Sequence, residues 1–316
     1  MCTWPPPQLR RLLAIPAITL AMAASGQNTY YVSPSGNDGN SGLTGSPWKT
    51  ITRVNTAISS SLASGDEVLF EGGATYTGSI KVHNKSGISF GAVPSTGTPV
   101  IDGALPVMNT WNPWVDPIGN PEEYPIYRAE LTLPHAPNAQ AAHVYMEGER
   151  LTLARFPNTG FFFAGEIDDT SLKDDALTQG SGYWVGAEVV IRHWGWSYSK
   201  QPVTSFASSV LGFPALNGGV QDYNWGYFLC NKLEELDQAG EWYYDGTYLY
   251  VWALDDDEPE DVSVVVLYTH NDNDWENQGF DLQNANDITI DGFAIRHFAK
   301  SGVSCYISHR TTVRNC

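Results

Sequence analysis

Short strands that recur at a constant offset near the end of the chain restrict its fold more than any other feature of the sequence. Segment 280–282 aligns with 303–305, and 288–291 aligns with 311–314, at the same offset. A period in the low twenties with two or three short strands is typical of a parallel β-solenoid, whose coils stack because one coil cannot bury its own apolar residues. The repeat therefore predicts stacked coils in this part of the chain.

The alternation within these strands predicts which side chains enter the core, because successive residues of a strand point to opposite faces. The apolar residues are expected to point inward, namely Phe280, Leu282, Ile288 and Ile290. The polar residues between them are expected to point outward, namely Asp281, Thr289 and Asp291. The same offset places Ser304 beside Asp281 and Arg314 beside Asp291 in the next coil.

One amphipathic helix is predicted near the start of the chain, over 47–62. Ser46-Pro47 is typical of a helix start, because a hydroxyl caps free N–H groups and proline fits the first turn. Apolar residues then follow at spacings of three or four, the pattern of one buried helix face, namely Trp48, Ile51, Val54, Ile58 and Leu62. We expect this helix to cover the open first coil, whose edge would otherwise be unpaired.

Strand-like segments follow the helix and change character in the middle of the chain. Ile80 and Ile101 indicate an early repeat of similar period, which region 105–270 does not keep. That region contains eight of the 11 Trp and segments that alternate like strands. The predicted division is a cap with the first coils over 27–104, an inserted β-rich domain over 105–270 and resumed coils over 271–316.

Composition narrows the classes of partner. Acidic residues number 35 against 17 basic ones, a net charge of −18, which repels phosphate backbones and makes nucleic acid an unsuitable partner. Hydrophobic residues make up 42% of the chain, enough for a sizeable core, so general disorder is excluded. The low charged fraction of 16% argues against a coiled coil.

Segment 1–26 has the pattern of a secretory signal peptide. Arg10 and Arg11 precede an apolar stretch over 12–24, which ends in small residues. The stretch is interrupted by Pro16 and is shorter than the roughly 20 residues that cross a membrane, so no membrane span is expected. The sequence therefore predicts export, to the extracellular space or the periplasm.

Three cysteines remain after the predicted cleavage. They are Cys230, Cys305 and Cys316, and an odd number cannot all pair, so the chain is not a disulfide scaffold. We expect Cys305 and Cys316 to be buried thiols.

Several motifs resemble a known superfamily. YYVSPSGND over 30–38, PWKTI over 47–51, GDEVLF over 65–70 and PVIDG over 99–103 resemble the start of secreted pectate-lyase-like proteins. LARFPN over 153–158, GEWYYD over 240–245 and LYVW over 249–252 are similar to the glycoside hydrolase subset with an inserted β-domain. The resemblance implies an all-β fold, a right-handed parallel β-helix with an N-terminal capping helix and an inserted β-rich domain.

The resemblance also implies a polysaccharide or oligosaccharide substrate. A glycoside hydrolase is the first expectation, with a polysaccharide lyase and a non-catalytic glycan-binding surface protein as alternatives, because this fold carries many functions. Such proteins usually have more coils, and this chain stops within a strand pattern at Cys316. We therefore expect a fragment, with part of the reactive groove on later coils.

Glycoside hydrolysis needs two carboxylates about 5–5.5 Å or about 6.5–9.5 Å apart. Asp281 and Asp291 are the candidate catalytic carboxylates, although they lie on different segments of one coil and each is stacked on a residue that is not a carboxylate. Solvated outward residues are the alternative. His297 is a candidate acid or base, with an ordinary turn histidine as its alternative.

A basic run in an acidic chain keeps the lyase alternative open, since lyases neutralise a uronate with cationic side chains. Its members are Arg296, His297, Lys300, His309, Arg310 and Arg314. Arg296 is accordingly a candidate for substrate binding. Exposed turn residues are the alternative for the whole run.

Two further groups concern metal and sugar. Asp272, Asp274 and Glu276 form an oxygen-rich loop that can hold Ca²⁺, but the loop fails the EF-hand pattern and turn formation explains it better, so no metal or cofactor is predicted. Aromatic and polar residues that suit sugar stacking are candidate substrate-binding residues, with core packing as the alternative: Arg192, His193, Trp194, Trp196 and Trp225.

Overall fold

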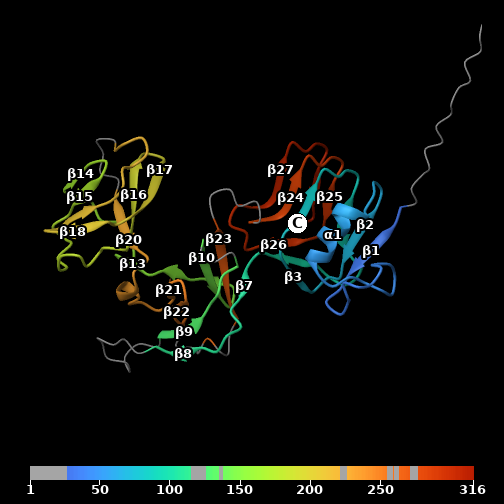
Figure 1. Ribbon diagram of the computed structural model, residues 1–316, viewed down its shortest axis with the longest axis horizontal. Helices are drawn as coiled ribbons and strands as arrows, with labels where there is room; N and C mark the ends of the chain where they lie inside the picture. The colour runs from blue at the N-terminus through green and yellow to red at the C-terminus, as the bar shows by residue number, and fades with distance from the viewer. Residues whose placement is uncertain are drawn as a thin grey trace, which may run out of the picture.

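The chain folds into an elongated, mainly β molecule with parallel sheets at one end and antiparallel sheets at the other (Figure 1). The computed structural model describes residues 27–114, 126–134, 138–220, 226–254, 259, 263–270 and 277–316. Within these ranges there is one α-helix, α1 (Ile51–Ser60), and one 3₁₀-helix, η1 (Leu233–Glu235).

Three parallel sheets form the end of the molecule that contains both the first and the last described strands. Sheet A consists of β1 (Thr29–Val32), β2 (Glu67–Phe70), β5 (Ser89–Ala92), β25 (Thr289–Asp291) and β28 (Thr312–Arg314). Sheet B consists of β3 (Thr75–Thr77), β6 (Val100–Asp102) and β26 (Ala294–Arg296). Sheet C consists of β4 (Ile80–His83), β24 (Gln278–Gln283) and β27 (Ser301–Tyr306).

The chain visits these sheets in a fixed order, so successive circuits form stacked coils. It runs from β2 in sheet A to β3 in sheet B and β4 in sheet C, then through β5 and β6, and later from β24 to β28 in the same rotation. The constant offset predicted for the last coils is confirmed, because Phe280 pairs with Val303 and Thr289 pairs with Thr312. The predicted early repeat of Ile80 and Ile101 was wrong, because the two residues lie in different sheets. Ile80 pairs with Phe280 in sheet C, whereas Ile101 lies in sheet B.

The coils enclose one hydrophobic core. The four residues predicted to point inward, Phe280, Leu282, Ile288 and Ile290, are fully buried. Aromatic rings from different coils meet in the core, with Phe280 in edge contact with both Phe90 and Phe293. This core is the reason why coils far apart in the sequence stack, because each coil buries its apolar row only against its neighbours.

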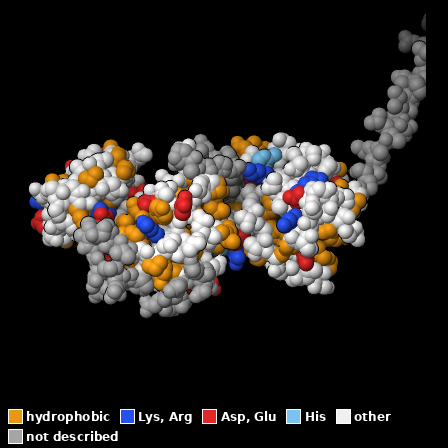
Figure 2. All heavy atoms as spheres, turned by 60° about the horizontal axis from the view of Figure 1, so that its bottom comes forward, with side chains coloured by type: hydrophobic (Ala, Val, Ile, Leu, Met, Phe, Trp, Pro, Cys, Tyr) orange, Lys and Arg blue, Asp and Glu red, His pale blue; other side chains and the backbone are white. Residues whose placement is uncertain are grey.

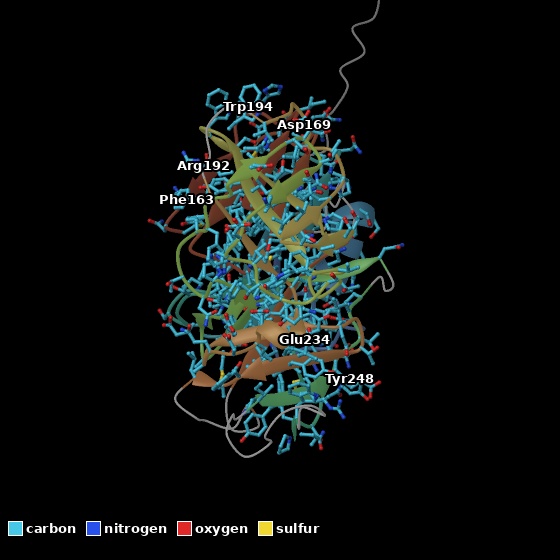
Figure 3. All side chains as sticks on the ribbon, turned by 90° about the vertical axis from the view of Figure 1, so that its left-hand side faces the viewer. Phe163, Asp169, Arg192, Trp194, Glu234 and Tyr248 are labelled. Atoms are coloured by element: carbon cyan, nitrogen blue, oxygen red, sulfur yellow. The ribbon has the colours of Figure 1, made fainter. Side chains whose placement is uncertain are left out.

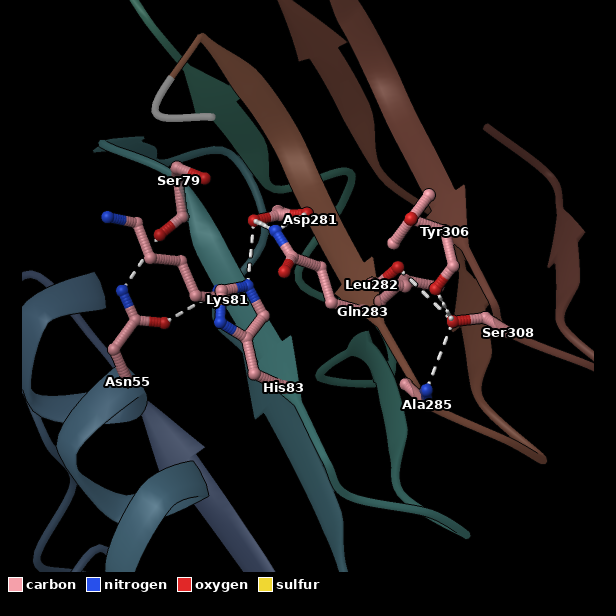
Figure 4. Close-up of polar contacts among 10 residues, drawn as sticks. All are labelled: Asn55, Ser79, Lys81, His83, Asp281, Leu282, Gln283, Ala285, Tyr306 and Ser308. Carbon is pink, nitrogen blue, oxygen red and sulfur yellow. Dashed lines mark hydrogen bonds and ion pairs between the residues drawn. The ribbon is translucent and has the colours of Figure 1, made fainter. Parts of the chain in front are cut away.

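Helix α1 covers the edge strand β4, as the sequence predicts. The Asn55 side chain donates to the Ser79 carbonyl at 2.8 Å and accepts from the Lys81 amide at 2.9 Å (Figure 4). It thus satisfies two backbone groups that a neighbouring strand would otherwise satisfy. The predicted helix start was wrong by several residues, because the N-cap is Thr50, whose hydroxyl accepts from the Arg53 amide.

Four further sheets lie between β6 and β24 in the sequence. Sheet E consists of β11 (Glu149–Arg150), β10 (Ala139–Met146), β23 (Val264–His270) and β7 (Leu105–Pro106). Sheet F consists of β12 (Thr152–Leu153), β21 (Glu241–Tyr244), β22 (Tyr248–Trp252), β9 (Ile126–Glu130) and β8 (Asn112–Pro113). Sheet G consists of β13 (Arg155–Phe156), β20 (Tyr227–Cys230), β16 (Glu188–Trp194) and β17 (Ser197–Pro202). Sheet H consists of β14 (Glu166–Ile167), β15 (Ser171–Lys173), β19 (Val210–Gly212) and β18 (Ser205–Ala207).

These four sheets pair their strands in antiparallel fashion, apart from the short parallel pair of β12 and β21. They pack around cores separate from that of the coils, one of them centred on Trp184 and another on Trp242. The change from parallel to antiparallel pairing coincides with the loss of the coil period in the sequence. The domain boundaries themselves stay predictions.

The expectation of buried thiols at Cys305 and Cys316 was wrong, because both residues are exposed while Cys230 is buried. Cys305 pairs with the inward-pointing Leu282. It is nevertheless exposed, because β27 is an edge strand and no described strand covers its other side. Charged side chains lie singly or in small groups among uncharged atoms on the face in Figure 2.

Some predictions concern segments beyond the described residues. They are the signal peptide over 1–26, Trp225 and the acidic loop over 272–276. Within the described part of the chain, no helix is both long enough and apolar enough to span a membrane.

Replacing Asn55 by Ala should destabilise the fold, because it leaves the Ser79 carbonyl and the Lys81 amide without their partner. Each unsatisfied buried group costs about 1–3 kcal/mol. Asn55→Asp should cost less, since a carboxylate still accepts from the Lys81 amide. Urea unfolding measures both effects, with Thr52→Ala on the exposed side of α1 as the control. Equal stability of Asn55→Ala and the control would contradict the role of Asn55 as an edge cap.

Candidate functional site

The outer face of sheet C carries a buried carboxylate. Asp281 points away from the core, as its strand position predicts, but its side chain is 0% exposed. Its Oδ2 atom accepts a hydrogen bond from Gln283 Nε2 at 3.0 Å. The same oxygen lies 2.7 Å from His83 Nε2 (Figure 4). The alternative of a solvated outward residue is therefore wrong for Asp281, because neighbouring side chains on this face enclose it.

His83 is the accessible member of this pair. Its side chain is 39% exposed, whereas Asp281 is enclosed. A carboxylate that bonds one ring nitrogen fixes the orientation of the imidazole and leaves the other nitrogen for proton exchange. Lys81 stands directly beside Asp281 in the register of β4 and β24, so the face combines a carboxylate, an imidazole and an ammonium group. Such a set can position a substrate and transfer protons.

A cavity of about 340 Å³ adjoins this face at the start of β4. Lys81, Asn277 and Tyr268 contribute to its wall, together with residues of α1. The Ser79 hydroxyl is buried without a hydrogen-bond partner among the described residues, and Ser79 also lines the cavity. Buried polar groups normally have partners, so this unpartnered hydroxyl is an exception within the cavity wall.

Asp291 lies in sheet A and is not brought together with Asp281 in sheet C. Arg314 donates to Asp291 Oδ2 at 3.0 Å, and Asn315 donates to Oδ1 at 2.8 Å. Both hydrogen bonds lower the pKa of Asp291, and the bond from Asn315 has the larger effect. The predicted stacking of Asp291 on Arg314 is confirmed, and the pair is an ordinary ion pair between coils.

His297 forms part of a second enclosed cluster. Its Nδ1 lies 2.9 Å from Asp102 Oδ1, and Arg296 Nε donates to Asp102 Oδ2 at 2.9 Å. The Tyr145 ring, from strand β10, lies 4.4 Å from the imidazole ring between centroids. The His297 side chain is only 12% exposed, so the cluster joins the coils to sheet E. A catalytic role for His297 stays a prediction.

The basic run near the end of the chain is largely paired with aspartates of neighbouring coils. Arg296 pairs with Asp102, Arg310 with Asp287 and Arg314 with Asp291. The last two pairs repeat the offset that relates the final two coils. The three arginines of the run therefore already have carboxylate partners.

The predicted aromatic residues gather at the far end of sheet G. Trp196 is 78% exposed and lies in edge contact with Trp194, while Arg192 lies over the exposed Tyr198 ring. Figure 3 shows Trp194, Arg192 and Phe163 toward one side of this end, away from Glu234 and Tyr248. We call Trp194, Trp196 and Tyr198 the aromatic platform. Its open rings suit the apolar face of a sugar.

His193 precedes Trp194 in strand β16 and is buried. It is 3% exposed, with Nδ1 at 2.9 Å from the Gly219 carbonyl and Nε2 at 2.9 Å from the Ser199 hydroxyl. Both ring nitrogens therefore have protein partners, and the Gly219 carbonyl also accepts from Trp194 Nε1 of the platform at 2.9 Å. Direct substrate contact by His193 and Arg192 stays a prediction.

Glu241 is a buried carboxyl group with a perturbed pKa. The side chain is 3% exposed, and burial raises its pKa from 4.5 to about 7. A hydrogen bond from the Asp237 amide, at 3.2 Å, opposes this shift without cancelling it. Perturbed acids often mark functional sites, although structural burial has the same effect.

No cluster of three or more His, Cys, Asp or Glu side chains suits a metal ion within the described ranges. The acidic loop considered for Ca²⁺ lies outside those ranges. The expectation about metal therefore stays a prediction.

The sequence reasoning missed His83, Lys81 and Asp102, because their partners lie on the far side of the inserted sheets in the sequence. A signal was present. Asn84 and Asn284 begin similar turns, and the two side chains bond to each other at 2.9 Å. Aligning the segments 81–88 and 281–288 would have placed Asp281 next to Lys81 and near His83.

Comparisons with known proteins support the fold. A solved structure named "Glycoside hydrolase" matches with a TM-score of 0.65 and 16% identity, over 85% of this chain and 50% of that chain. A solved structure of XylC with xylose matches with a lower TM-score of 0.41 and 17% identity, over 85% of this chain and 35% of that chain. No family model and no curated protein matches the chain. The chain thus shares a fold with half the length of a glycoside hydrolase structure.

The raised pKa of Glu241 predicts a pH dependence of stability. The folded state holds the proton more tightly than the unfolded state, so the contribution is complete below pH 4.5 and is lost as the pH rises to about 7. The loss amounts to about 3 kcal/mol at ~1.4 kcal/mol per pKa unit. Urea unfolding of Glu241→Gln should show a smaller fall between pH 5 and pH 8 than the unmodified protein. The exposed Glu149→Gln serves as control, and an identical fall in all three proteins would refute the assignment.

Proposed function

We propose that this chain belongs to a secreted, right-handed parallel β-helix protein that hydrolyses glycosidic bonds in polysaccharide. The proposal concerns the whole protein, since the chain spans half the length of the glycoside hydrolase structure that it resembles. Export rests on the pattern of segment 1–26. The handedness rests on the strong preference of parallel crossover connections for the right-handed form.

The observation that carries the proposal is the enclosed carboxylate of Asp281 on an outward face of the coils. An outward carboxylate would ordinarily remain in water, because burying a charge is costly unless it is hydrogen-bonded. Asp281 is fully buried and bonded to His83, which is itself accessible. This arrangement favours a proton-transferring pair on a surface where a glycan chain can lie.

Hydrolysis also requires a carboxylate pair. The strand neighbours of Asp281 are Lys81 and Ser304, so the neighbouring strands supply no second carboxylate in register. We therefore assign the Asp281–His83 pair to proton transfer and orientation, and expect the carboxylate pair of the whole protein to form along the same face.

The lyase alternative loses its main support. Its basis was the basic run over 296–314, whose three arginines are paired with Asp102, Asp287 and Asp291. A uronate carboxylate would have to displace these partners. The glycan-binding alternative retains support from the exposed aromatic platform, since such rings suit a sugar face with or without catalysis.

Product analysis separates the three functions. Incubation with plant and algal glycans should release reducing ends without unsaturated uronates if the protein is a hydrolase. Unsaturated uronates would support the lyase instead. Retention on glycan columns without either product would overturn both enzymatic functions.

Replacing Asp281 by Asn or His83 by Gln should lower the rate of reducing-end release by about 100-fold or more, the usual contribution of a positioned acid or base. The exposed His309→Gln is the matched control and should keep the rate. Thermal unfolding checks that each variant folds. Full activity in both variants would remove sheet C from the mechanism.

Replacing Trp196 by Ala should weaken glycan binding about three- to tenfold, in line with about 0.5–1.5 kcal/mol for an aromatic contact. The ring is 78% exposed, so stability should hardly change. Affinity electrophoresis in glycan gels measures the effect. Val185→Ala, another exposed apolar residue of the same region, is the control. Unchanged migration of the Trp196 variant would show that the platform does not bind the tested glycan.

A further inference from the structure

A second cavity, of about 450 Å³, lies among sheets E, F and G, away from the Asp281–His83 pair. Its wall includes residues of strands β10, β13, β17, β20 and β21. The volume falls within the range of about 300–1,000 Å³ typical of small-molecule sites. Phe228, Trp242, Leu151 and Leu153 supply apolar surface.

The charge of this cavity is opposite to that of the protein. Arg150, Arg155 and Lys200 line it, and the described residues of its wall include no Asp or Glu. Lys200 is paired with the nearby Glu188 at 2.9 Å. Arg150 and Arg155 have no carboxylate within ion-pair distance among the described residues. Two guanidinium groups therefore face one cavity without an ion-pair partner in that part of the chain, although the protein has a net charge of −18.

Arg155 is held in place but incompletely bonded. Its Nη2 donates to the Gly160 carbonyl at 2.6 Å, and its guanidinium lies 4.0 Å above the Phe228 ring. Its Nε is buried without a hydrogen-bond partner among the described residues. A planar guanidinium binds carboxylate or sulfate through paired N–H groups. Arg155 lines the cavity with its guanidinium held in place, so this group suits an oxyanion bound there.

The remaining polar groups of the wall add no negative charge. Arg150 Nη2 donates to His143 Nδ1 at 2.9 Å, and burial together with Arg150 lowers the pKa of His143. Burial and the nearby Glu188 raise the pKa of the Cys230 thiol to about 12. Both shifts favour the neutral side chain. The charged side chains of the wall itself are therefore cations, and Glu188 beside Lys200 and Glu241 near Arg155 offset part of their charge.

We propose that this cavity binds the oxyanion of an acidic saccharide, the carboxylate of a uronate or a sulfate ester. The guanidinium groups of Arg150 and Arg155 bind the oxyanion, while the apolar wall contacts the sugar ring. The saccharide part of this proposal rests on the proposed function. The anion part rests only on the cavity.

Isothermal titration of the whole chain with galacturonate, galactose 6-sulfate and galactose tests the proposal. Either acidic sugar should bind more tightly than neutral galactose, and the affinity should fall with added salt. Arg150→Gln and Arg155→Gln should each weaken this binding about tenfold or more, the effect of losing one charge-assisted hydrogen bond. Arg150 is exposed, so its replacement keeps the test valid if the Arg155 variant folds poorly.

Matched controls separate this site from the rest of the protein. Arg128→Gln removes the same charge from sheet F, where Arg128 lies over the Tyr248 ring outside the cavity, and should leave binding intact. Asp281→Asn changes the coils and should also leave saccharide binding to this cavity intact. The titration therefore tests the cavity even if the proposed hydrolysis fails. Equal binding of galactose, or acidic-sugar binding that survives both arginine replacements, would overturn the proposal. Binding of inorganic sulfate alone, lost on Arg150→Gln, would keep an anion site and overturn its saccharide ligand.

Discussion

The parallel pairing of strands that the whole inserted region separates in the sequence is the constraint on which the rest of the structure depends. Strand β24 returns to pair with β4, so that Phe280 lies beside Ile80, and β25 and β26 pair with β5 and β6 in the same way. The chain therefore leaves the coils after β6, forms the antiparallel sheets, and must return at the position where β24 pairs with β4 in sheet C. The buried aromatic contacts among Phe90, Phe280 and Phe293 stabilise this return.

The same pairing creates the polar clusters of the coils. It brings Asp281 beside Lys81 and within reach of His83, and it brings Arg296 to Asp102. Exposed ion pairs contribute little to stability, typically about 0–1 kcal/mol. Their repetition between coils nevertheless disfavours other registers, because a shifted coil would leave each charge beside an unmatched neighbour. Enclosed Asp281 and Asp102 carry more of this effect than exposed Asp287 does.

The sequence predicted the features that depend on two adjacent coils. It missed the features that depend on the pairing of strands across the inserted sheets. The constant offset of the last coils and the inward positions of Phe280 and Leu282 follow from two adjacent coils, and both are confirmed. The Asp281–His83 pair requires the register across the inserted sheets, which neither alternation nor spacing reveals. The helix begins at Ile51 because the preceding Trp48 forms a β-bridge with Val32, a tertiary contact that overrides the Ser46-Pro47 signal.

The two polar sites are complementary in their electrostatics. Asp281 on the coils is a buried carboxyl group bonded to an accessible histidine, whereas Arg155 between the inserted sheets is a fixed guanidinium group with an unpaired Nε–H among the described residues. The net negative charge of the chain opposes the approach of an acidic glycan at long range, but salt screens that repulsion beyond about 8 Å under physiological conditions. Within the cavity the local arginines dominate, because a fixed donor in a partly desolvated wall acts at short range. The cavity therefore suits an anion although the chain is acidic, because Arg150 and Arg155 lack ion-pair partners among the described residues. The basic run over 296–314 suits an anion less well, because aspartates of neighbouring coils already pair with its arginines.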